Sequence, residues 1–414
     1  MSTDSRRVVV TGMGLICPCG NTVEDSWKNI VAGISGIDRI TAFDPSGYDS
    51  QIGGEIKNFE PLQFIDKKDA KRMDRSVQLA MTASAEAMAS IDEGEFDGDR
   101  FGTIIGSGIG GISTFEQQHE ILLQRGPSRI SPFFIPMMIS DMAAGQVSIR
   151  YGLRGPNFGT VSACASGGHA ICDSYMYIKN GYADMMLTGG TEATISPMAL
   201  GGFCSMKALS TRNDEPQRAS RPFDRDRDGF IMSEGAGLVI LEELEHAKAR
   251  GAHILAEVMG VGLTGDAFHI TSPVPGGIGA ARAMKMALNT TGLKPSDVDY
   301  INAHGTSTLY NDKIESEAIR SVFGEATNGV KVSSTKSVTG HLLGAAAALE
   351  FIVCVKVLNE GLLPPTANLD NPDPECALSH IPIQAEKRDI SIVMSNSFGF
   401  GGHNVSIVLM RYES

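Results

Sequence analysis

The sequence has no apolar run long enough to cross a membrane, and basic residues are fewer than acidic ones. With 35 Lys and Arg against 48 Asp and Glu, the net charge is −13, so the chain is a poor general binder of nucleic acid. Its first residues, MSTDSRRVVVTGMG, place strand-like residues after two arginines, which is not the pattern of a secretory signal. We therefore expect a cytoplasmic protein with no membrane insertion and no nucleic-acid partner.

Paired cysteine spacings are also missing. The chain has seven cysteines, an odd number that does not fit a disulfide framework. The CPC run at 17–19 lacks the spacing of a zinc pair and has no matching second pair. We expect free, mostly buried thiols and no metal site.

What is present is typical of a large globular protein: 414 residues, 42% hydrophobic and 20% charged. Apolar runs such as RRVVVTGMG, FGTIIGSGIGG and VDYINAHGTST indicate strands that end in glycine turns. Helical patterns lie between such runs, at 76–92, 164–180, 240–251, 277–292, 311–324 and 341–359. This alternation predicts an α/β fold with mainly parallel, buried strands.

Two segments share one organisation. FGTVSACASGGHAICDSYMYI and VKVSSTKSVTGHLLGAAAALEFIVCV each indicate a strand, a turn of small residues and a helix. We infer two related halves, residues 1–250 and 251–414. No low-complexity linker separates them, so they should pack as one body.

The run GSGIGG at 106–111 fits the dinucleotide fingerprint G-x-G-x-x-G. The segment after it, ISTFEQQHEILLQRG, makes a poor crossover helix. No strand ending in an acidic residue follows about 20 residues on, where one would bind a ribose. We expect a tight glycine turn at a packed interface rather than a nucleotide site.

Cys164 lies in VSACASGGH, between a strand and a helix that begins near Ala165. The free N–H groups and partial positive charge of a helix N-terminus favour a thiolate and lower its pKa. Small neighbours would admit a substrate carbonyl and leave the Cys164 N–H free as an oxyanion donor. Buried structural cysteine is common, so the local sequence leaves catalysis and packing as equal alternatives.

Two histidines stand where α/β sheets form sites. His304 ends a strand in NAHGTST, and His341 lies in TKSVTGHLLGAAAALE at the start of a predicted helix. Either could instead be a satisfied polar residue of the core. Lys336, in a buried turn, needs a charge partner, and Glu350 is the best candidate.

Five motifs in this order resemble the elongating β-ketoacyl-[acyl-carrier-protein] synthases, most closely the synthase II type. They are SACASGG, RPFDRDRDGFIMSEGAG, NAHGTST, SSTKSVTGHLLGAAAALE and NSFGFGG, and the resemblance covers essentially the whole chain. It implies a thiolase-like fold, in which two related α/β halves form a five-layer αβαβα arrangement, and a homodimer.

The resemblance also implies roles for single residues. Cys164 matches the nucleophile, and His304 and His341 match the active-site histidine pair. Lys336 matches the active-site lysine, with Glu350 as its charge partner. No metal or organic cofactor is implied, because the phosphopantetheine arm belongs to the acyl carrier protein.

Further matches surround this centre. Phe400 matches a gating aromatic whose N–H completes the oxyanion hole with that of Cys164, and Phe398 shares its glycine-rich turn, where simple packing is the alternative. Ile109 matches a residue of the acyl pocket near the dimer interface. Asp266 and His269 match a second mobile loop.

The implied partner, acyl carrier protein, is acidic. That gives a docking role to the basic stretch DKKDAKRMDR, expected on a helix, although a solvated helix face is the plainer alternative. The docking residues so assigned are Lys67, Lys68, Lys71, Arg72 and Lys207.

The implied reaction is the decarboxylative condensation of malonyl-carrier protein with an acyl group held on Cys164, in type II fatty acid biosynthesis. A ketosynthase of a specialised or polyketide pathway is the alternative, because His403 replaces the usual threonine and Leu309 and Tyr310 replace a proline and a small residue. A non-catalytic chain-length partner would lack Cys164. A thiolase would use a second cysteine in place of the two-histidine pattern.

Overall fold

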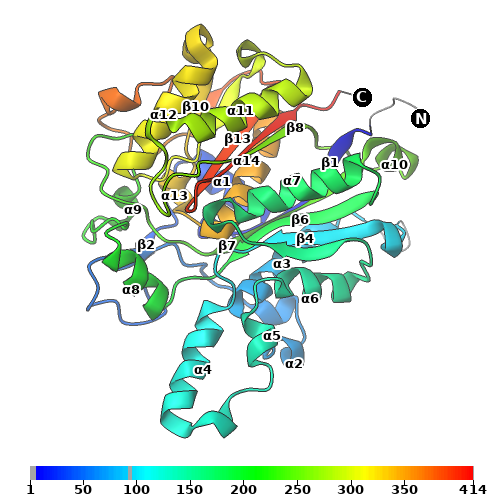
Figure 1. The fold of residues 1–414 in the computed structure, drawn as a ribbon, viewed down its shortest axis with the longest axis vertical. Coiled ribbons are helices and arrows are strands. Elements are labelled where there is room, and N and C mark those ends of the chain that lie inside the picture. The colour runs from blue at the N-terminus through cyan, green and yellow to red at the C-terminus, as the bar shows by residue number, and fades with distance from the viewer. Residues whose placement is uncertain (1–5, 92–95, 414) are drawn as a thin grey trace.

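The computed structural model describes residues 6–91 and 96–413, and within them one ten-stranded sheet dominates (Figure 1). Its strands run in the order β10-β9-β13-β14-β8-β1-β7-β6-β4-β5. They are β1 (Val8–Ile16), β4 (Phe101–Gly106), β5 (Asn157–Thr160), β6 (Met185–Glu192), β7 (Gly235–Glu243), β8 (Ala256–Gly265), β9 (Tyr300–Asn302), β10 (Lys331–Ser333), β13 (Ile392–Gly399) and β14 (His403–Met410). Two short strand pairs lie outside it: β2 (Asp38–Arg39) with β3 (Ile52–Gly53), and β11 (Leu362–Leu363) with β12 (Glu386–Lys387).

The prediction of mainly parallel strands is wrong, because the sheet is mixed. β4 is parallel to β5 and β6, and β9 is parallel to β10 and β13, but the six central strands pair antiparallel with one another. The tight turn between β13 and β14 requires that direction. The sequence hides it because helices cover the sheet, and strands buried on both faces read as continuous apolar runs whatever their direction.

The sheet repeats one order twice from its centre outward, as β1-β7-β6-β4-β5 and as β8-β14-β13-β9-β10. The two halves join where Val8 pairs with Val258. Each central strand also packs against its own helix in the same way: a Cβ added at Gly14 would lie 1.9 Å from the Ala83 carbonyl oxygen, and one added at Gly262 would lie 1.9 Å from that of Ala283. The predicted boundary at residue 250 falls between β7 and β8 and stays a prediction.

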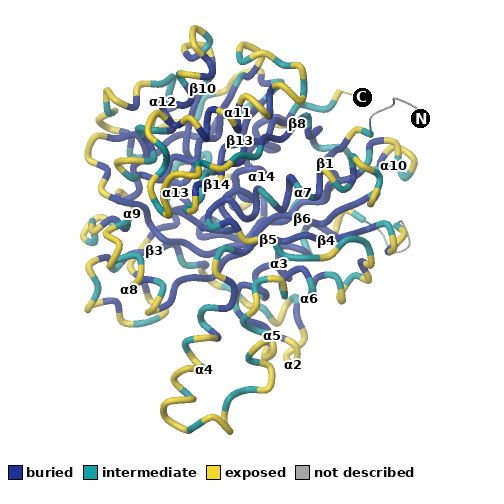
Figure 2. Tube along the Cα trace, viewed as in Figure 1, coloured by how far each residue is buried: buried dark blue, intermediate teal, exposed yellow. Residues whose placement is uncertain are grey.

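Helices form three layers around the two half-sheets. α7 (Ser166–Lys179) and α14 (Ala346–Glu360) contact strands of both halves and so lie between them, which explains why α14 is apolar and buried around most of its surface (Figure 2). α3 (Arg75–Met88) and α6 (Met142–Tyr151) pack on the outer face of the first half. α11 (Ile278–Thr291) packs on the second half, with α12 (Leu309–Phe323) against it. Together they make five layers.

The remaining helices are shorter or peripheral. They are α1 (Val23–Val31), α2 (Lys67–Ala70), α4 (Ile112–Arg125), α5 (Phe134–Met138), α8 (Pro197–Ser205), α9 (Pro216–Ala219), α10 (Leu244–Ala249) and α13 (Lys336–Thr339). No helix among the described residues has the length and apolar character that a membrane span needs.

Two predicted segments need correction, and for a third, residues 112–126, the prediction is confirmed. Residues 240–243 complete β7 rather than begin a helix, because this apolar run is buried within the sheet. The helix predicted from residue 341 begins only at Ala346, so His341 precedes it. The segment judged a poor crossover helix is helical, as α4, but it packs on α5 and projects from the body (Figure 1).

Candidate active site

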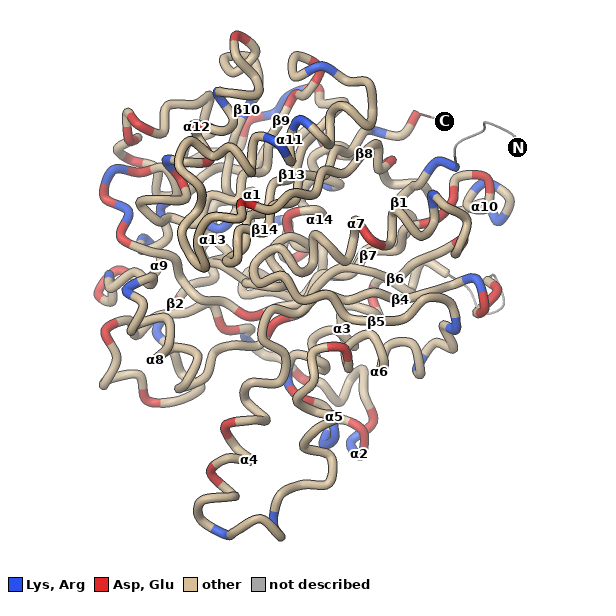
Figure 3. Tube along the Cα trace, in the orientation of Figure 1, with Lys and Arg blue, Asp and Glu red and all other residues tan. Residues whose placement is uncertain are grey.

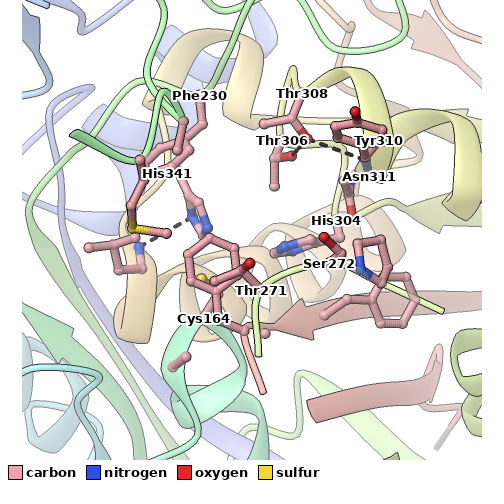
Figure 4. Close-up of a pocket in the computed structure, with 18 of the residues that line it drawn as sticks. Cys164, Phe230, Thr271, Ser272, His304, Thr306, Thr308, Tyr310, Asn311 and His341 are labelled. Carbon is pink, nitrogen blue, oxygen red and sulfur yellow. Dashed lines mark hydrogen bonds between the residues drawn. The ribbon is translucent and has the colours of Figure 1, made fainter. Parts of the chain in front are cut away.

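A cavity of about 500 Å³ lies between the two halves and is lined by residues from both. It collects most of the residues that the sequence singled out (Figure 4). They are Cys164, His304, His341, Phe398, Phe400, Ile109, Asp266 and Lys207.

Cys164 stands on a tight corner between β5 and α7. Ala163 before it has a left-handed φ of 50°, and a short 3-10 turn then leads into the helix. Ser166 holds this corner: its hydroxyl donates to the Ala163 carbonyl at 2.7 Å and accepts from the Ser162 N–H at 2.9 Å. The corner directs the thiol into the cavity, yet Cys164 is only 8% exposed.

The predicted lowering of the Cys164 pKa is wrong. Burial raises the pKa of the thiol to about 12, although the Lys336 charge and the Phe400 N–H both act to lower it. Desolvation outweighs the helix N-terminus because the thiol lies almost out of solvent. The Cys164 side chain is therefore a neutral thiol at rest.

The turn after β13 packs directly on the Cys164 corner. A Cβ added at Gly399 would lie 2.6 Å from the Ser162 carbonyl oxygen and 3.2 Å from the Cys164 nitrogen, so the two backbones approach closely. Phe400 follows Gly399 and lines the cavity. The N–H groups of Cys164 and Phe400 thus lie beside one another at the sulfur, as an oxyanion hole requires.

Both histidines are neutral hydrogen-bond donors toward the cavity. Lys336 Nζ lies 3.3 Å from His304 Nδ1, and the Leu343 N–H donates to His341 Nδ1 at 3.2 Å. An ammonium and an amide only donate, so each Nδ1 is the acceptor and each ring carries its proton on Nε2. Burial lowers the pKa of both imidazoles well below the usual value, and the Lys336 charge adds to it.

The two rings are 5.3 Å apart and nearly perpendicular, and Figure 4 shows both facing the space above Cys164. His341 Nε2 is buried and has no hydrogen-bond partner among the described residues. A buried polar atom without a partner is costly, so this nitrogen is available for a ligand atom in the cavity.

Lys336 does not reach the cavity itself but lies behind His304. It is fully buried, and its ammonium donates to the His304 carbonyl at 2.6 Å, to His304 Nδ1 and to the Glu350 carboxylate. All three N–H bonds are therefore used. Burial raises the pKa of Glu350 to about 7, and Lys336 opposes that rise.

The other expected residues lie around the mouth. Asp266 lines the cavity and accepts from Asn404 Nδ2 at 2.6 Å, whereas His269 is exposed and does not line it. His403, expected near the gate, is exposed outside the cavity, with its ring edge-on to that of His169. Tyr310 lines the rim and is 74% exposed.

The basic stretch forms no single helix: α2 spans only Lys67–Ala70. Lys67, Lys68, Lys71 and Arg72 are nevertheless exposed, and α2, which begins this stretch, lies beside α5 (Figure 3). Arg75 starts α3 and is not available for docking, because it forms a 2.6 Å ion pair with the buried Glu234. Lys207, at the cavity mouth, pairs with Asp49 at 2.6 Å.

Two buried carboxylates escaped the sequence reasoning. Glu315 on α12 accepts the N–H groups of His304 and Gly305, each at 2.8 Å, and burial raises its pKa to about 7. Glu192 ends β6 at the cavity wall. The available signal was an acidic residue inside a buried run, as in LTGGTEAT.

The glycine run 106–111 also has an explanation. The N–H groups of Gly108 and Ile109, which would meet a phosphate in a dinucleotide site, donate to Glu192 instead. A carboxylate of the protein already occupies that turn.

Comparison with known proteins identifies the class. Residues 5–247 match the family model for the N-terminal domain of beta-ketoacyl synthases, and residues 255–370 match that for the C-terminal domain. The chain belongs to the beta-ketoacyl synthase family, and the predicted enzyme class, an acyltransferase of ketosynthase type, is confirmed.

Individual relatives are similar over their whole length. The 3-oxoacyl-[acyl-carrier-protein] synthase 2 of Synechocystis sp. is 52% identical over 412 residues, which is 99% of each chain. The Staphylococcus aureus protein of the same name is 50% identical over 414 residues, with both chains fully covered.

Solved structures agree. A beta-ketoacyl synthase from Burkholderia phymatum superposes with a TM-score of 0.92 at 36% identity over 99% of this chain and all of that one. A type II polyketide ketosynthase, solved in complex with its acyl carrier protein, superposes with a TM-score of 0.91 at 35% sequence identity, over 99% of this chain and all of that one. The predicted thiolase-like fold is thereby confirmed.

Proposed function

We propose that this enzyme condenses malonyl-[acyl-carrier-protein] with an acyl group held on Cys164, and so extends the chain by two carbons in type II fatty acid biosynthesis. The observation that carries the proposal is the pair of neutral Nε2–H donors, on His304 and His341, that face the space above the thiol. The names of the two relatives at about half identity support the same reaction.

In the first half-reaction, the Cys164 sulfur attacks the thioester carbonyl of acyl-carrier protein. The N–H groups of Cys164 and Phe400 stabilise the oxyanion that forms. The carbon–sulfur bond to the phosphopantetheine arm breaks, and the thiol proton of Cys164 ends on the departing thiol. The product is an acyl thioester on Cys164.

In the second half-reaction, the thioester carbonyl of malonyl-carrier protein accepts hydrogen bonds from His304 and His341. The bond to the carboxylate then breaks, CO2 leaves, and the electron pair remains as an enolate that these donors stabilise. Because both imidazoles are neutral, they stabilise this carbanion without readily protonating it. The enolate attacks the acyl thioester, and Cys164 leaves as a thiolate that takes up a proton.

Lys336 acts through His304. Its ammonium occupies the Nδ1 side of that ring, so the ring proton stays on the cavity side. With three acceptors already bound, Lys336 has no free N–H bond for substrate and is not a nucleophile. Glu350 compensates its buried charge.

The proposed partners are acyl carrier protein and a second copy of this chain, in the cytoplasm. The exposed basic residues around α2 support the first, because they would attract an acidic carrier. A related ketosynthase solved with its carrier protein gives further support. We propose that no metal or organic cofactor takes part.

A specialised or polyketide pathway is the second candidate, favoured by the structural likeness to a polyketide ketosynthase at 35% identity. Intact-mass measurement after incubation with saturated acyl-carrier proteins of graded length tests both. Acylation of Cys164 by long saturated chains supports fatty acid elongation. Acylation by polyketide intermediates alone would favour the alternative, and no acylation by either would overturn the proposed function.

A further inference from the structure

Glu192 is a buried carboxylate at the cavity wall for which the proposed reaction has no use. It ends β6, has no exposed surface, and accepts four hydrogen bonds from two different turns. From the turn after β4 come the Ser107 hydroxyl at 3.0 Å and the N–H groups of Gly108 at 2.7 Å and Ile109 at 3.2 Å. From the turn before α14 comes the Gly344 N–H at 2.9 Å.

The two turns touch one another at this carboxylate. A Cβ added at Gly344 would lie 2.4 Å from the Gly108 nitrogen and 2.6 Å from Glu192 Oε2, so no larger residue fits there. One turn carries Ile109 into the cavity, and the other leads back to His341. Glu192 therefore joins the expected acyl side of the cavity to one of the two imidazoles.

The route from Glu192 to His341 passes through one strained residue. Leu343 has a left-handed φ of 49°, which is unfavourable for a side chain of its size. Its N–H donates to His341 Nδ1, and the next N–H, that of Gly344, donates to Glu192. The donor to Glu192 therefore lies one peptide along the chain from the donor to His341.

We propose that Glu192 is a positioning residue that keeps the His341 proton on Nε2 by holding the Leu343–Gly344 turn. The inference rests on the proposed function and deepens it: the malonyl half-reaction depends on Glu192, whereas acyl transfer to Cys164 does not. A carboxylate that does not touch the reacting atoms would then determine which nitrogen of His341 carries the proton.

The charge of Glu192 also affects Cys164. Its removal should make the thiol more reactive, whereas it should make malonyl decarboxylation slower. Burial is the main cause of the raised pKa of Cys164, and the Glu192 charge adds to that rise, while burial also raises the pKa of Glu192 itself. Replacing Glu192 by a neutral amide therefore lowers the pKa of the thiol and makes it more reactive. General damage to the fold would not speed one reaction at Cys164 while it slows the reaction that needs His341.

The test compares Glu192→Gln with the wild-type enzyme in three assays. They are acylation of Cys164 by dodecanoyl-carrier protein, decarboxylation of malonyl-carrier protein, and alkylation of Cys164 by iodoacetamide at fixed pH. We expect decarboxylation to fall about 10- to 100-fold, on the scale of losing one oriented donor, and acylation to stay within about threefold. Alkylation should become faster.

Glu86→Gln is the matched control. The Glu86 carboxylate also accepts two backbone N–H groups, those of Leu15 and Val23 at 2.9 Å each, and burial also raises its pKa. It does not line the cavity. We expect this variant to leave the ratio of the two half-reactions unchanged.

Equal losses in both half-reactions, or unchanged decarboxylation, would overturn the role of Glu192. If thermal melting shows that Glu192→Gln does not fold, Ser107→Ala decides, because it removes one of the four donors. A selective fall in decarboxylation then supports the role, and an unchanged ratio overturns it. Wild-type enzyme that performs neither half-reaction would instead refute the proposed function.

Discussion

The corner before α7 and the corner before α14 are built alike but differ in content. In both, a left-handed residue, Ala163 or Leu343, opens a 3-10 turn that leads into a central helix. The next residue is Cys164 in the first corner and Gly344 in the second. One repeated backbone thus presents a nucleophile on one side and, on the other, only an N–H group.

The two corners also differ in length. Residues 161–162 separate β5 from the first corner, whereas residues 334–342 separate β10 from the second. The longer connection contains Lys336 and His341, which the first corner has no room to carry. Under the proposed function, the two corners divide the reaction: the first forms the covalent bond, and the second polarises the second substrate.

Replacing Cys164, the proposed nucleophile, should give the largest effect, because neither corner residue would then carry a reactive side chain. We expect Cys164→Ala to lower acyl transfer by at least about 10³-fold, because the sulfur is the atom acylated. Intact mass after incubation with acyl-carrier protein measures it. Acylation of the variant at the wild-type rate would refute the mechanism.

Removing one imidazole should separate the half-reactions. We expect His304→Ala to lower malonyl decarboxylation about 10²- to 10³-fold, the usual loss for one oxyanion donor, and to affect acyl transfer less. CO2 release and thioester formation, measured separately, test this. Equal losses would contradict the division of the reaction between the two halves.

The buried ion pair of the second half should matter for stability as well. Glu350→Gln leaves the Lys336 ammonium buried without its charge partner, and we expect unfolding free energy to fall by about 3–5 kcal/mol. Denaturant unfolding measures the change. The exposed pair Lys207 and Asp49 provides the control, since Lys207→Ala should leave the free energy of unfolding nearly unchanged.

The pH profile should be flatter than histidine chemistry usually gives. Folding lowers the pKa of His304 and His341, so both stay neutral as the pH falls through the ordinary histidine range. We expect decarboxylation to keep its rate at pH 6, about half a unit below a free imidazole pKa. As the pH falls, the imidazoles of the unfolded chain take up protons before those of the folded protein. The contribution of these two residues to folding stability therefore declines below the free imidazole pKa. A rate loss centred on the ordinary pKa would contradict the assigned neutral state.

The smallest effect should come from the residue that departs from the family pattern. His403 lies outside the cavity, so we expect His403→Thr to change either half-reaction by less than about twofold, as for a surface substitution away from the site. Steady-state rates with acyl- and malonyl-carrier protein measure it. A larger loss would mean that this exposed imidazole reaches the reaction through the Phe400 turn.

The sequence predicts most of this site because its residues sit in short motifs with fixed local geometry. Cys164 and His304 each follow a strand end and His341 precedes a helix, and the structure brings all three to one cavity. Glu192 and Glu315 could not be found this way. Glu192 binds an N–H group of a turn far along the chain, that of Gly344, and Glu315 reaches the Gly305 N–H from the face of a helix. Strand direction could not be predicted for a related reason, because each strand pairs with strands that lie far along the chain.

The raised pKa of Cys164 could not be predicted from the neighbouring sequence either. A helix N-terminus can be seen in the sequence, but the depth to which two packed halves bury the thiol cannot. The same limit applies to His403, whose place in the motif put it near the gate. Its ring instead lies edge-on to that of His169, outside the cavity.

A neutral, buried nucleophile has a consequence for survival of the enzyme in the cell. Peroxides oxidise thiolates, and the damage proceeds from sulfenic to irreversible acids wherever a sulfur is ionised and accessible. Cys164 lines the cavity but is not ionised in the resting enzyme, although it lies at a helix N-terminus, where thiolates elsewhere act as redox sensors. If Cys164 is the nucleophile, as proposed, its raised pKa slows the oxidation of a sulfur that the reaction requires.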